Sequence, residues 1–269
     1  MVLKALKNLL GAKSQKADLP SVPAGERYYV VGDIHGRCDL FEALADAVDA
    51  DDRASGPANT TIVLLGDLVD RGADSAGVIR RAREWQRARK VRILAGNHEE
   101  MFLESFDDEE VLRHFLKHGG RETVLSYGIP LADYNRLSVS ELLTQLPSII
   151  PQEDRDFLDG FEEKIIAGDY LFVHAGINPK RPIEEQTRKD MLWIRDRFLS
   201  YEGPLPKVVV HGHTIFDDVE DRGIRIGIDT GAFRSGVLTA LVLEDDTRRT
   251  IKAVDKDTSI AIVHEELTT

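Results

Sequence analysis

The stretch "TIVLLGDLVDRG", residues 61–72, decides the fold. Four consecutive apolar residues, Ile62 to Leu65, follow a β-branched threonine, which is typical of a short strand buried on both faces. The sequence then turns abruptly polar: Gly66 is followed by Asp67, Asp70 and Arg71. A buried strand that ends in charged side chains places them beyond its carboxyl end, where open α/β sheets carry their functional sites.

The same pattern occurs on both sides of this stretch. "YYVVGDIHGR" (residues 28–37) and "VRILAGNHEE" (residues 91–100) are also apolar runs that end in a glycine and polar side chains. Amphipathic periodicity predicts helices between them, over residues 38–49 and 75–89. Strand, helix, strand, helix, strand with continuously apolar strands predicts a parallel sheet with right-handed crossovers.

The second half of the chain has a different pattern. Residues 101–163 are acidic and helical in periodicity, and we interpret them as a helical insertion over or beside the sheet. Four apolar runs follow at residues 170–176, 207–213, 225–231 and 237–245. They are too closely spaced for helices between all of them, so we expect part of this half to be antiparallel. The prediction is an α/β fold with α+β character, in which residues 27–269 form one catalytic domain.

Composition restricts the partners and the compartment. The chain has 269 residues and a net charge of −12, so no general affinity for nucleic acid or anionic membranes is expected. One cysteine, Cys38, rules out a disulfide framework and suits a reducing cytoplasm. No apolar stretch reaches the length of a membrane span. Residues 1–26 are expected to be a flexible extension, with a short basic amphipathic helix as the alternative.

Five predicted strand ends deliver metal-binding side chains to one edge of the sheet. Each alone could be turn chemistry or a core histidine, but buried carboxylates and imidazoles gathered together are costly without a cation. The set mixes carboxylate, imidazole and amide oxygen without sulfur, which suits Mn²⁺, Fe or Zn²⁺ better than Ca²⁺ or Mg²⁺ alone. One bridging carboxylate can hold two ions about 3.5–4 Å apart, the spacing used for in-line attack on phosphorus.

The segments "GDIHGR", "GDLVDRG", "GNHE", "HAG", "HGHT" and "DTGA" occur between Gly32 and Ala232. In this order and spacing the chain resembles the calcineurin-like metallophosphoesterases, and more closely the bacterial branch of the phosphoprotein phosphatase family. "GGRETVLSYG" in the insertion also resembles that branch. The resemblance implies a two-sheet sandwich flanked by helices and two divalent metal ions, with Mn²⁺ favoured and Fe or Zn²⁺ possible. The implied metal ligands are Asp33 and His35 for the first ion, Asp67 as the bridge, and Asn97, His174 and His213 for the second.

The resemblance also implies roles for the remaining residues. A metal-bridging hydroxide would attack phosphorus in line, with Arg71, Asn97 and Arg195 contacting the phosphate and Arg197 as the alternative to Arg195. His98 would protonate the leaving group and Asp70 would orient it. Two further residues are expected to support the fold: Glu99 to steady the following helix, and His211 to sit behind the ligands. His114 and His118 are interpreted as solvated helix residues, because no third ligand is apparent near them.

The implied function is a serine/threonine protein phosphatase acting on phosphorylated proteins or peptides. A symmetrical diadenosine tetraphosphate hydrolase is the main alternative, but that family tends to lack the aspartate at Asp70 and to read "GNHD" where this chain has Glu99. A phosphotyrosine or dual preference remains open. A nuclease would need a nucleic-acid surface that the acidic composition does not offer. A non-enzymatic binding module would be expected to have lost a ligand, and none is missing.

Overall fold

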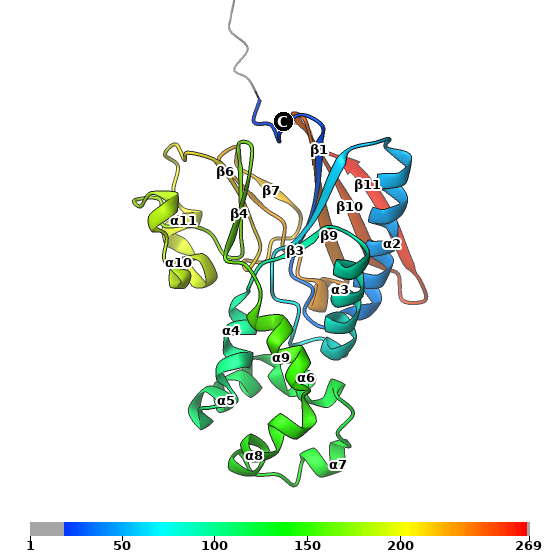
Figure 1. The fold of residues 1–269 in the computed structure, drawn as a ribbon, viewed down its shortest axis with the longest axis vertical. Helices are drawn as coiled ribbons and strands as arrows, with labels where there is room; N and C mark the ends of the chain where they lie inside the picture. Colours follow the sequence, from blue (N-terminus) through cyan, green and yellow to red (C-terminus); the bar gives the residue numbers. More distant parts are fainter. Residues whose placement is uncertain (1–18, 268–269) are drawn as a thin grey trace, which may run out of the picture.

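The computed structural model describes residues 19–267 and contains two β-sheets (Figure 1). The first has six strands in the order β11-β10-β9-β1-β2-β3. Its parallel half is β1 (Glu26–Val31), β2 (Asn59–Leu64) and β3 (Val91–Ile93), and its antiparallel half is β9 (Val237–Glu244), β10 (Thr247–Asp255) and β11 (Ile260–Glu266).

The second sheet has five strands in the order β4-β5-β6-β8-β7. Their bounds are β4 (Lys164–Ala167), β5 (Tyr170–Val173), β6 (Val208–His211), β7 (Glu220–Asp221) and β8 (Arg225–Gly227). β5, β6 and β8 run parallel, and the two outer strands are antiparallel to them.

The alternation of side chains along β1 explains why its sequence is apolar throughout. Tyr29 and Val31 pack against α2 (Cys38–Ala54) and α3 (Ser75–Ala88) on the outer face of the first sheet. Tyr28 and Val30 point the other way, into the core between the two sheets. Since successive strand residues face opposite sides, a strand in the middle of such a sandwich is buried on both faces.

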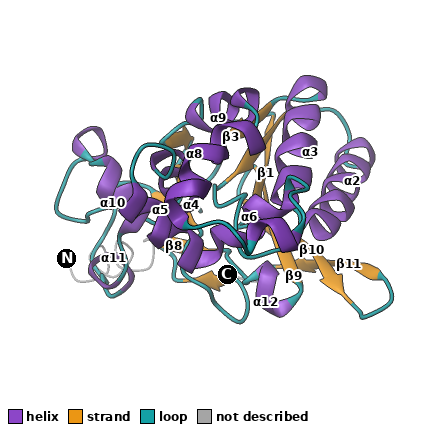
Figure 2. Cartoon of the chain, turned by 90° about the horizontal axis from the view of Figure 1, so that it is seen from below, coloured by secondary structure: helices purple, strands orange, loops and turns teal. Residues whose placement is uncertain are grey.

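The outer face of the second sheet is covered by α10 (Arg188–Trp193) and α11 (Asp196–Leu199). Met191, Ile194 and Phe198 pack there against Leu171 and Val209. The two sheets are therefore flanked by helices on both outer sides, as the sequence predicted (Figure 2). A 3₁₀ turn at Ile183–Glu185 precedes α10, and α12 (Ala232–Ser235) precedes β9.

The insertion is helical, as predicted, and lies beyond one end of the sheets (Figure 1). It comprises α4 (Asn97–Glu104), α5 (Glu109–Phe115), a kinked segment Leu116–Gly120, α6 (Arg121–Ser126), α7 (Leu131–Tyr134), α8 (Val139–Ile149) and α9 (Gln152–Asp159). Phe102, Phe115 and Leu146 belong to a hydrophobic cluster that also takes in Val69 and Ile79. The insertion is thus packed directly onto the loop after β2 and onto α3.

Several boundaries differ from the sequence prediction. The first crossover helix continues to Ala54, and strands β4, β10 and β11 were not expected. β11 is an edge strand in which no residue is fully buried, and its short apolar run Ile260–Val263 is followed directly by polar residues. Three findings tie the end of the predicted extension to the fold: Val22 is 3% exposed, its N–H donates to the carbonyl of Asp245 (3.0 Å), and the Ser21 N–H donates to Asp169. The amphipathic helix considered as the alternative lies outside the described residues.

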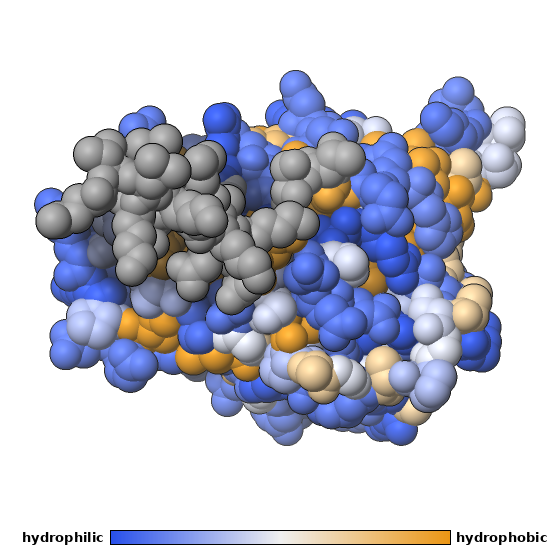
Figure 3. All heavy atoms as spheres, turned by 90° about the horizontal axis from the view of Figure 1, so that it is seen from above, coloured by the Kyte–Doolittle hydropathy of each residue, from blue (hydrophilic) through white to orange (hydrophobic). Residues whose placement is uncertain are grey.

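The face opposite the insertion is largely hydrophilic, with hydrophobic residues showing in places between the polar ones (Figure 3). Among the described residues, no helix has both the length and the apolar character that crossing a membrane requires.

Candidate active site

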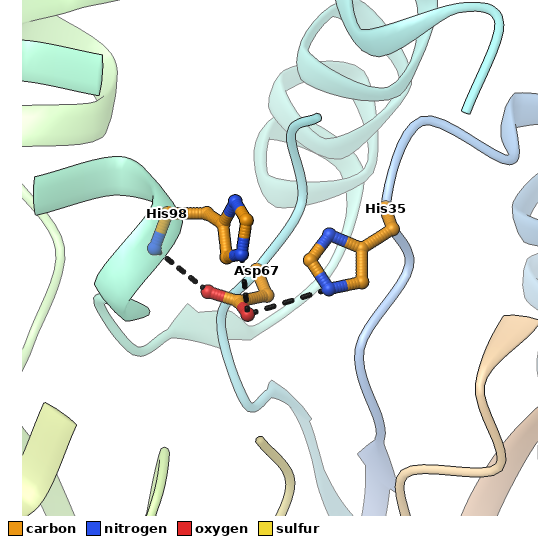
Figure 4. A group of neighbouring side chains, drawn as sticks. All are labelled: His35, Asp67 and His98. Atoms are coloured by element: carbon orange, nitrogen blue, oxygen red, sulfur yellow. Dashed lines mark hydrogen bonds and ion pairs between the residues drawn. The ribbon is translucent and has the colours of Figure 1, made fainter. Parts of the chain in front are cut away.

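The ends of five strands bring the predicted site residues together. Asp33 and His35 follow β1, Asp67 follows β2, Asn97 and His98 open α4 after β3, His174 follows β5, and His213 follows β6. Two groups have potential ligand atoms that all lie within 4.8 Å of one another: His35, Asp67 and His98 (Figure 4), and Asp67, His174 and His213. Asp67 is common to both groups.

The carboxylate of Asp67 lies between histidines from different elements. Its Oδ2 is 3.4 Å from His35 Nε2, and its Oδ1 is 3.4 Å from His174 Nε2. Asn97 Oδ1 lies 3.0 Å from His174 Nε2 and 2.7 Å from His213 Nδ1. Asp67 is therefore placed to bridge two ions, with Asn97 beside the second.

Asp33 lies outside both groups, although the sequence placed it with His35. Its Oδ2 accepts the His213 N–H at 3.0 Å. Burial raises the pKa of its carboxyl well above the usual range, and the nearby carboxylates of Asp229 and Asp67 add to this because like charges repel. The first group contains His98 instead, so the structure offers two candidate sets for the first ion.

The chemistry of this donor set fits divalent cations. Asp33 Oδ1 and His213 Nε2 are buried atoms without a hydrogen-bond partner among the described residues. Burial lowers the pKa of His35, His174 and His213, which keeps their imidazoles neutral and able to offer a lone pair. A cation would offset the cost of these buried, unpaired acceptors and of the crowded carboxylates.

The hydrogen bonds of His35 and His174 indicate which ring nitrogen is free. His35 Nδ1 lies 2.8 Å from the Val69 carbonyl, and His174 Nδ1 lies 2.9 Å from the Leu65 carbonyl. A carbonyl can only accept, so both Nδ1 atoms carry the proton and donate it. This leaves Nε2 of each ring as the acceptor that faces Asp67. Orientation of a ligand histidine by a backbone carbonyl is the usual arrangement around protein-bound metals.

Left-handed backbone is concentrated at this site. Among the described residues seven non-glycine residues have positive φ, and five belong to the site: His35 (46°), Asp67 (51°), Asp70 (73°), Arg71 (70°) and His213 (62°). Such conformations cost about 1–3 kcal/mol each and persist only where the surroundings hold them in place. Strained backbone is typical of functional sites, so the positions of these residues support the same candidate site as their side chains.

The loop after β2 is held by acceptors from elsewhere in the fold. Glu99 Oε2 accepts the Asp67 N–H (2.8 Å), and Glu99 Oε1 accepts those of Leu68 (2.8 Å) and Val69 (3.3 Å). The Asp70 N–H lies near the hydroxyls of Ser75 (3.0 Å) and Thr123 (2.9 Å). The Arg71 N–H donates to the Gly119 carbonyl (3.1 Å). Every N–H from Asp67 to Arg71 therefore has a partner, and each has at least one partner in the helical insertion.

Replacing Glu99 by glutamine is expected to lower the free energy of unfolding by about 2–4 kcal/mol. Both carboxylate oxygens accept backbone N–H groups, including that of Gly96 (2.9 Å). A glutamine NH₂ would face donors on one side and leave them buried without partners. Urea unfolding checks this, with Glu84→Gln on the exposed face of α3 as the control, expected to change stability by at most about 0.5 kcal/mol. Equal stability of the two variants would contradict the role of Glu99.

His98, Asp70 and Arg71 form one hydrogen-bonded group. His98 Nδ1 is 2.6 Å from Asp70 Oδ2, and Thr123 donates to Asp70 Oδ1 at 2.7 Å. Arg71 reaches over the site, with Nη1 2.8 Å from His35 Nε2 and Nη2 2.8 Å from His98 Nε2. Burial opposes the protonation of His98, but the carboxylates of Asp67 and Asp70 outweigh it and raise the pKa of the imidazole.

The insertion and α12 position Arg71 from two sides. Its guanidinium lies over the ring of Phe233, 4.8 Å from the centroid. Gly119 has φ +111°, and a Cβ there would lie 2.7 Å from Arg71 Cγ, so only glycine fits. Neither Thr123 nor Phe233 was predicted as a site residue. The segment "GGRETVLSYG", which resembles the bacterial branch of the family, does contain Gly119 and Thr123.

The other candidate residues have clear positions. Arg195 precedes α11. Burial is the main cause of the lowered pKa of His174 and His213, and the positive charge of Arg195 also contributes to both shifts. This favours Arg195 as the arginine nearer the site. His211 is buried against Phe198, and burial lowers its pKa to about 4, as suits a neutral core histidine. His114 and His118 lie with ring centroids 4.0 Å apart, exposed on the insertion and outside both groups of potential metal ligands.

A two-sheet sandwich whose strand ends bring buried carboxylate, imidazole and amide donors around a shared aspartate is the architecture of a metal-dependent hydrolase. The family model of the calcineurin-like phosphoesterases matches residues 26–235. The chain belongs to the calcineurin-like phosphoesterase family, whose members use a dinuclear metal centre. It is a metallophosphoesterase, and the predicted fold class is confirmed.

Similar proteins include enzymes of two kinds. Serine/threonine-protein phosphatase 2 of Escherichia coli (strain K12) is 28% identical over 222 residues, which cover 78% of this chain and 90% of that protein. The symmetrical bis(5'-nucleosyl)-tetraphosphatase of Acidovorax sp. (strain JS42) is 31% identical over 181 residues, which cover 67% of this chain and 50% of that protein. Among solved structures, a cold-active protein-tyrosine phosphatase of a psychrophilic Shewanella species shares the fold, with a TM-score of 0.53 and 18% identity over 94% of this chain and 88% of its own.

Proposed function

We propose that the protein is a phosphomonoesterase that removes phosphate from phosphoserine or phosphothreonine in proteins. Asp33, His35 and Asp67 would hold one divalent ion, and Asp67, Asn97, His174 and His213 a second. Bound there, the ions would supply Lewis acidity and make a water molecule nucleophilic near neutral pH. Mn²⁺ is the proposed metal because the donor set is mixed and contains no sulfur.

The chain's own residues would then do three things. Arg71 and Arg195 would bind the phosphoryl oxygens and neutralise the charge that develops on them. Asn97 would contact the phosphate from the start of α4. In the structure His98 Nε2 accepts a hydrogen bond from Arg71 Nη2 (2.8 Å). Once Arg71 binds the phosphate instead, Nε2 would hold a proton and deliver it to the leaving oxygen, while Asp70 keeps the ring in place through Nδ1.

The buried His98–Asp70 pair is the observation that carries this proposal. An alkoxide leaving from phosphoserine or phosphothreonine is strongly basic and needs a proton in the transition state, whereas a departing nucleotide phosphate is a far weaker base. A histidine whose pKa is raised by a buried aspartate suits the first reaction. The serine/threonine phosphatase relative, matched over 90% of its length, supports the same reading.

A symmetrical dinucleoside tetraphosphatase is the second candidate, favoured by the 31% identity to a protein of that name. The discriminating experiment compares kcat/KM of the manganese-loaded protein on a phosphothreonine peptide, a phosphotyrosine peptide and diadenosine tetraphosphate. We expect the phosphothreonine peptide to be the best substrate. Preference for the dinucleotide would overturn the proposal. Preference for the phosphotyrosine peptide would mean that the enzyme acts on phosphotyrosine instead of phosphothreonine. A cytoplasmic location stays a prediction.

Replacing Asp70 by asparagine is expected to move the descending, alkaline limb of the kcat–pH profile to lower pH. The proton donor must be protonated, so kcat falls as pH rises through the pKa of His98. The negative charge of Asp70 raises that pKa, and its removal lowers it. A shift of roughly one pH unit corresponds to about 1.4 kcal/mol of lost interaction. Asp46→Asn, whose side chain is 81% exposed, is the control; an alkaline limb that stays in place in Asp70→Asn would exclude this coupling.

A further inference from the structure

A basic hollow lies beside the candidate active site, on the surface formed by α10 and α11. It has a volume of about 600 Å³, and its lining includes four cationic side chains: Arg181, Lys189, Arg195 and Arg197. One carboxylate, Asp190, lies among them. In a chain with a net charge of −12, such a concentration of positive charge is unusual. A concave surface lined by one sign of charge concentrates ligands of the opposite sign.

Most of this positive charge is not compensated. Asp190 is engaged by Arg181 (3.2 Å) and by the hydroxyl of Thr187 (3.0 Å). Lys189, Arg195 and Arg197 form no ion pair within residues 19–267, whereas most other arginines of the described chain are paired. Exposed cations usually find carboxylates in so acidic a protein. Three free cations around one hollow therefore indicate a ligand that carries negative charge.

The hollow is continuous with the active site through Trp193 and Arg195. The ring of Trp193 lies 6.4 Å from that of His213, centroid to centroid. The Trp193 indole N–H donates to Glu100 at 2.7 Å, which fixes the ring although it is 36% exposed. On the other side of the indole the carboxylates of Glu100 and Glu104 lie opposite Arg188 and Lys189, so positive charge is in excess only on the side of the basic hollow. An anionic group next to the reacting phosphate is thereby directed toward α11.

We propose that this hollow is a subsite for a second anionic group of the substrate, formed by Lys189 and Arg197 beyond the phosphate-contacting Arg195. The inference rests on the proposed function and specifies it: the preferred phosphopeptide carries a carboxylate or phosphate near the phosphorylated residue. An extended peptide advances about 3.3–3.6 Å per residue, and side chains two residues apart share a face. We therefore expect the second anionic side chain two residues before or after the phosphothreonine in the peptide.

The test uses two phosphothreonine peptides that differ only in having glutamate or glutamine two residues to either side. The wild-type protein is expected to prefer the acidic peptide in kcat/KM by about 5- to 30-fold, because each exposed ion pair contributes up to about fivefold. The preference should weaken between about 0.05 and 0.5 M salt, as screening requires. In the double variant Lys189→Gln/Arg197→Gln the ratio is expected to approach 1.

The matched control is Arg53→Gln/Arg80→Gln, which removes the same charge from exposed positions of α2 and α3, away from α10 and α11 (Figure 2). It should retain the wild-type ratio. A wild-type ratio near 1, or an unchanged ratio in the Lys189/Arg197 variant, would overturn the subsite while peptide hydrolysis left the proposed function standing. Faster hydrolysis of diadenosine tetraphosphate than of either peptide would instead overturn the proposed function, and the peptide ratio would still report on the hollow.

Discussion

Replacing His98 by asparagine is expected to lower kcat for a phosphothreonine peptide by about 10²- to 10⁴-fold, the usual contribution of a general acid. The leaving alkoxide would have to depart without a proton. The asparagine side chain is also polar, and its NH₂ group can still donate to Asp70 as His98 Nδ1 does, so the buried carboxylate should keep a partner. The variant isolates proton donation from folding.

Two further measurements make this test specific. Turnover of p-nitrophenyl phosphate should fall much less, because p-nitrophenolate is a weak base and leaves without protonation. The metal content should stay at the wild-type value. His98 lies with His35 and Asp67 in one group of potential ligands, so a loss of one ion in His98→Asn would instead identify it as a ligand. Unchanged turnover of the phosphothreonine peptide would remove His98 from the mechanism.

Replacing Asp67 by asparagine is expected to abolish binding of both ions and to lower kcat/KM by about 10³-fold or more. Asp67 is the only residue common to both groups of potential ligands in the described chain. Burial raises the pKa of its carboxyl, yet the surrounding imidazoles, with the charge of His98 among them, hold it below the usual range, so the side chain is anionic at neutral pH. Several kcal/mol of transition-state stabilisation depend on the ions, and about 1.4 kcal/mol corresponds to each factor of ten.

The comparison variant is Asp33→Asn, because Asp33 is proposed to contact only the first ion. Metal analysis of the purified proteins is expected to give two ions per chain in the wild type, one in Asp33→Asn and none in Asp67→Asn. Asparagine at 67 can still accept the His98 N–H that Asp67 Oδ1 accepts at 3.0 Å, so the loop should keep its shape. Retention of two ions in Asp67→Asn would exclude it as the bridging ligand.

Much of the fold could be predicted from local patterns. Continuous apolar runs identified β1, β2, β3, β5, β6 and β9, and periodicity identified α2 and α3 to within a few residues at their ends. The missed strands β10 and β11 lie next to and at the edge of the sheet: charged residues interrupt the sequence of β10, and the apolar residues of β11 are partly exposed. The attachment of Val22 was missed because one buried residue produces no periodicity.

The candidate ligands could be predicted because each stands directly after a strand. The strongest sequence signal is also the most local one: a glycine at the end of a strand, followed by aspartate, histidine or asparagine. Asp33 shows the limit of this reasoning. Its place in the chain predicts a position beside His35, but its final position depends on contacts with Gly212, His213 and Asp229, which come from distant parts of the sequence.

The sequence by itself determined the order of the central strands and the two crossover helices, the class of chemistry and the candidate ligands, because these depend on residue type and spacing. Only the tertiary structure decided how the loop from Asp67 to Arg71 is shaped. Its left-handed residues are strained in isolation and are held by Glu99, Thr123 and Gly119. The basic hollow likewise arises only when α10 and α11 fold over the second sheet. Strain and charge clustering depend on long-range contacts, which residue spacing alone does not specify.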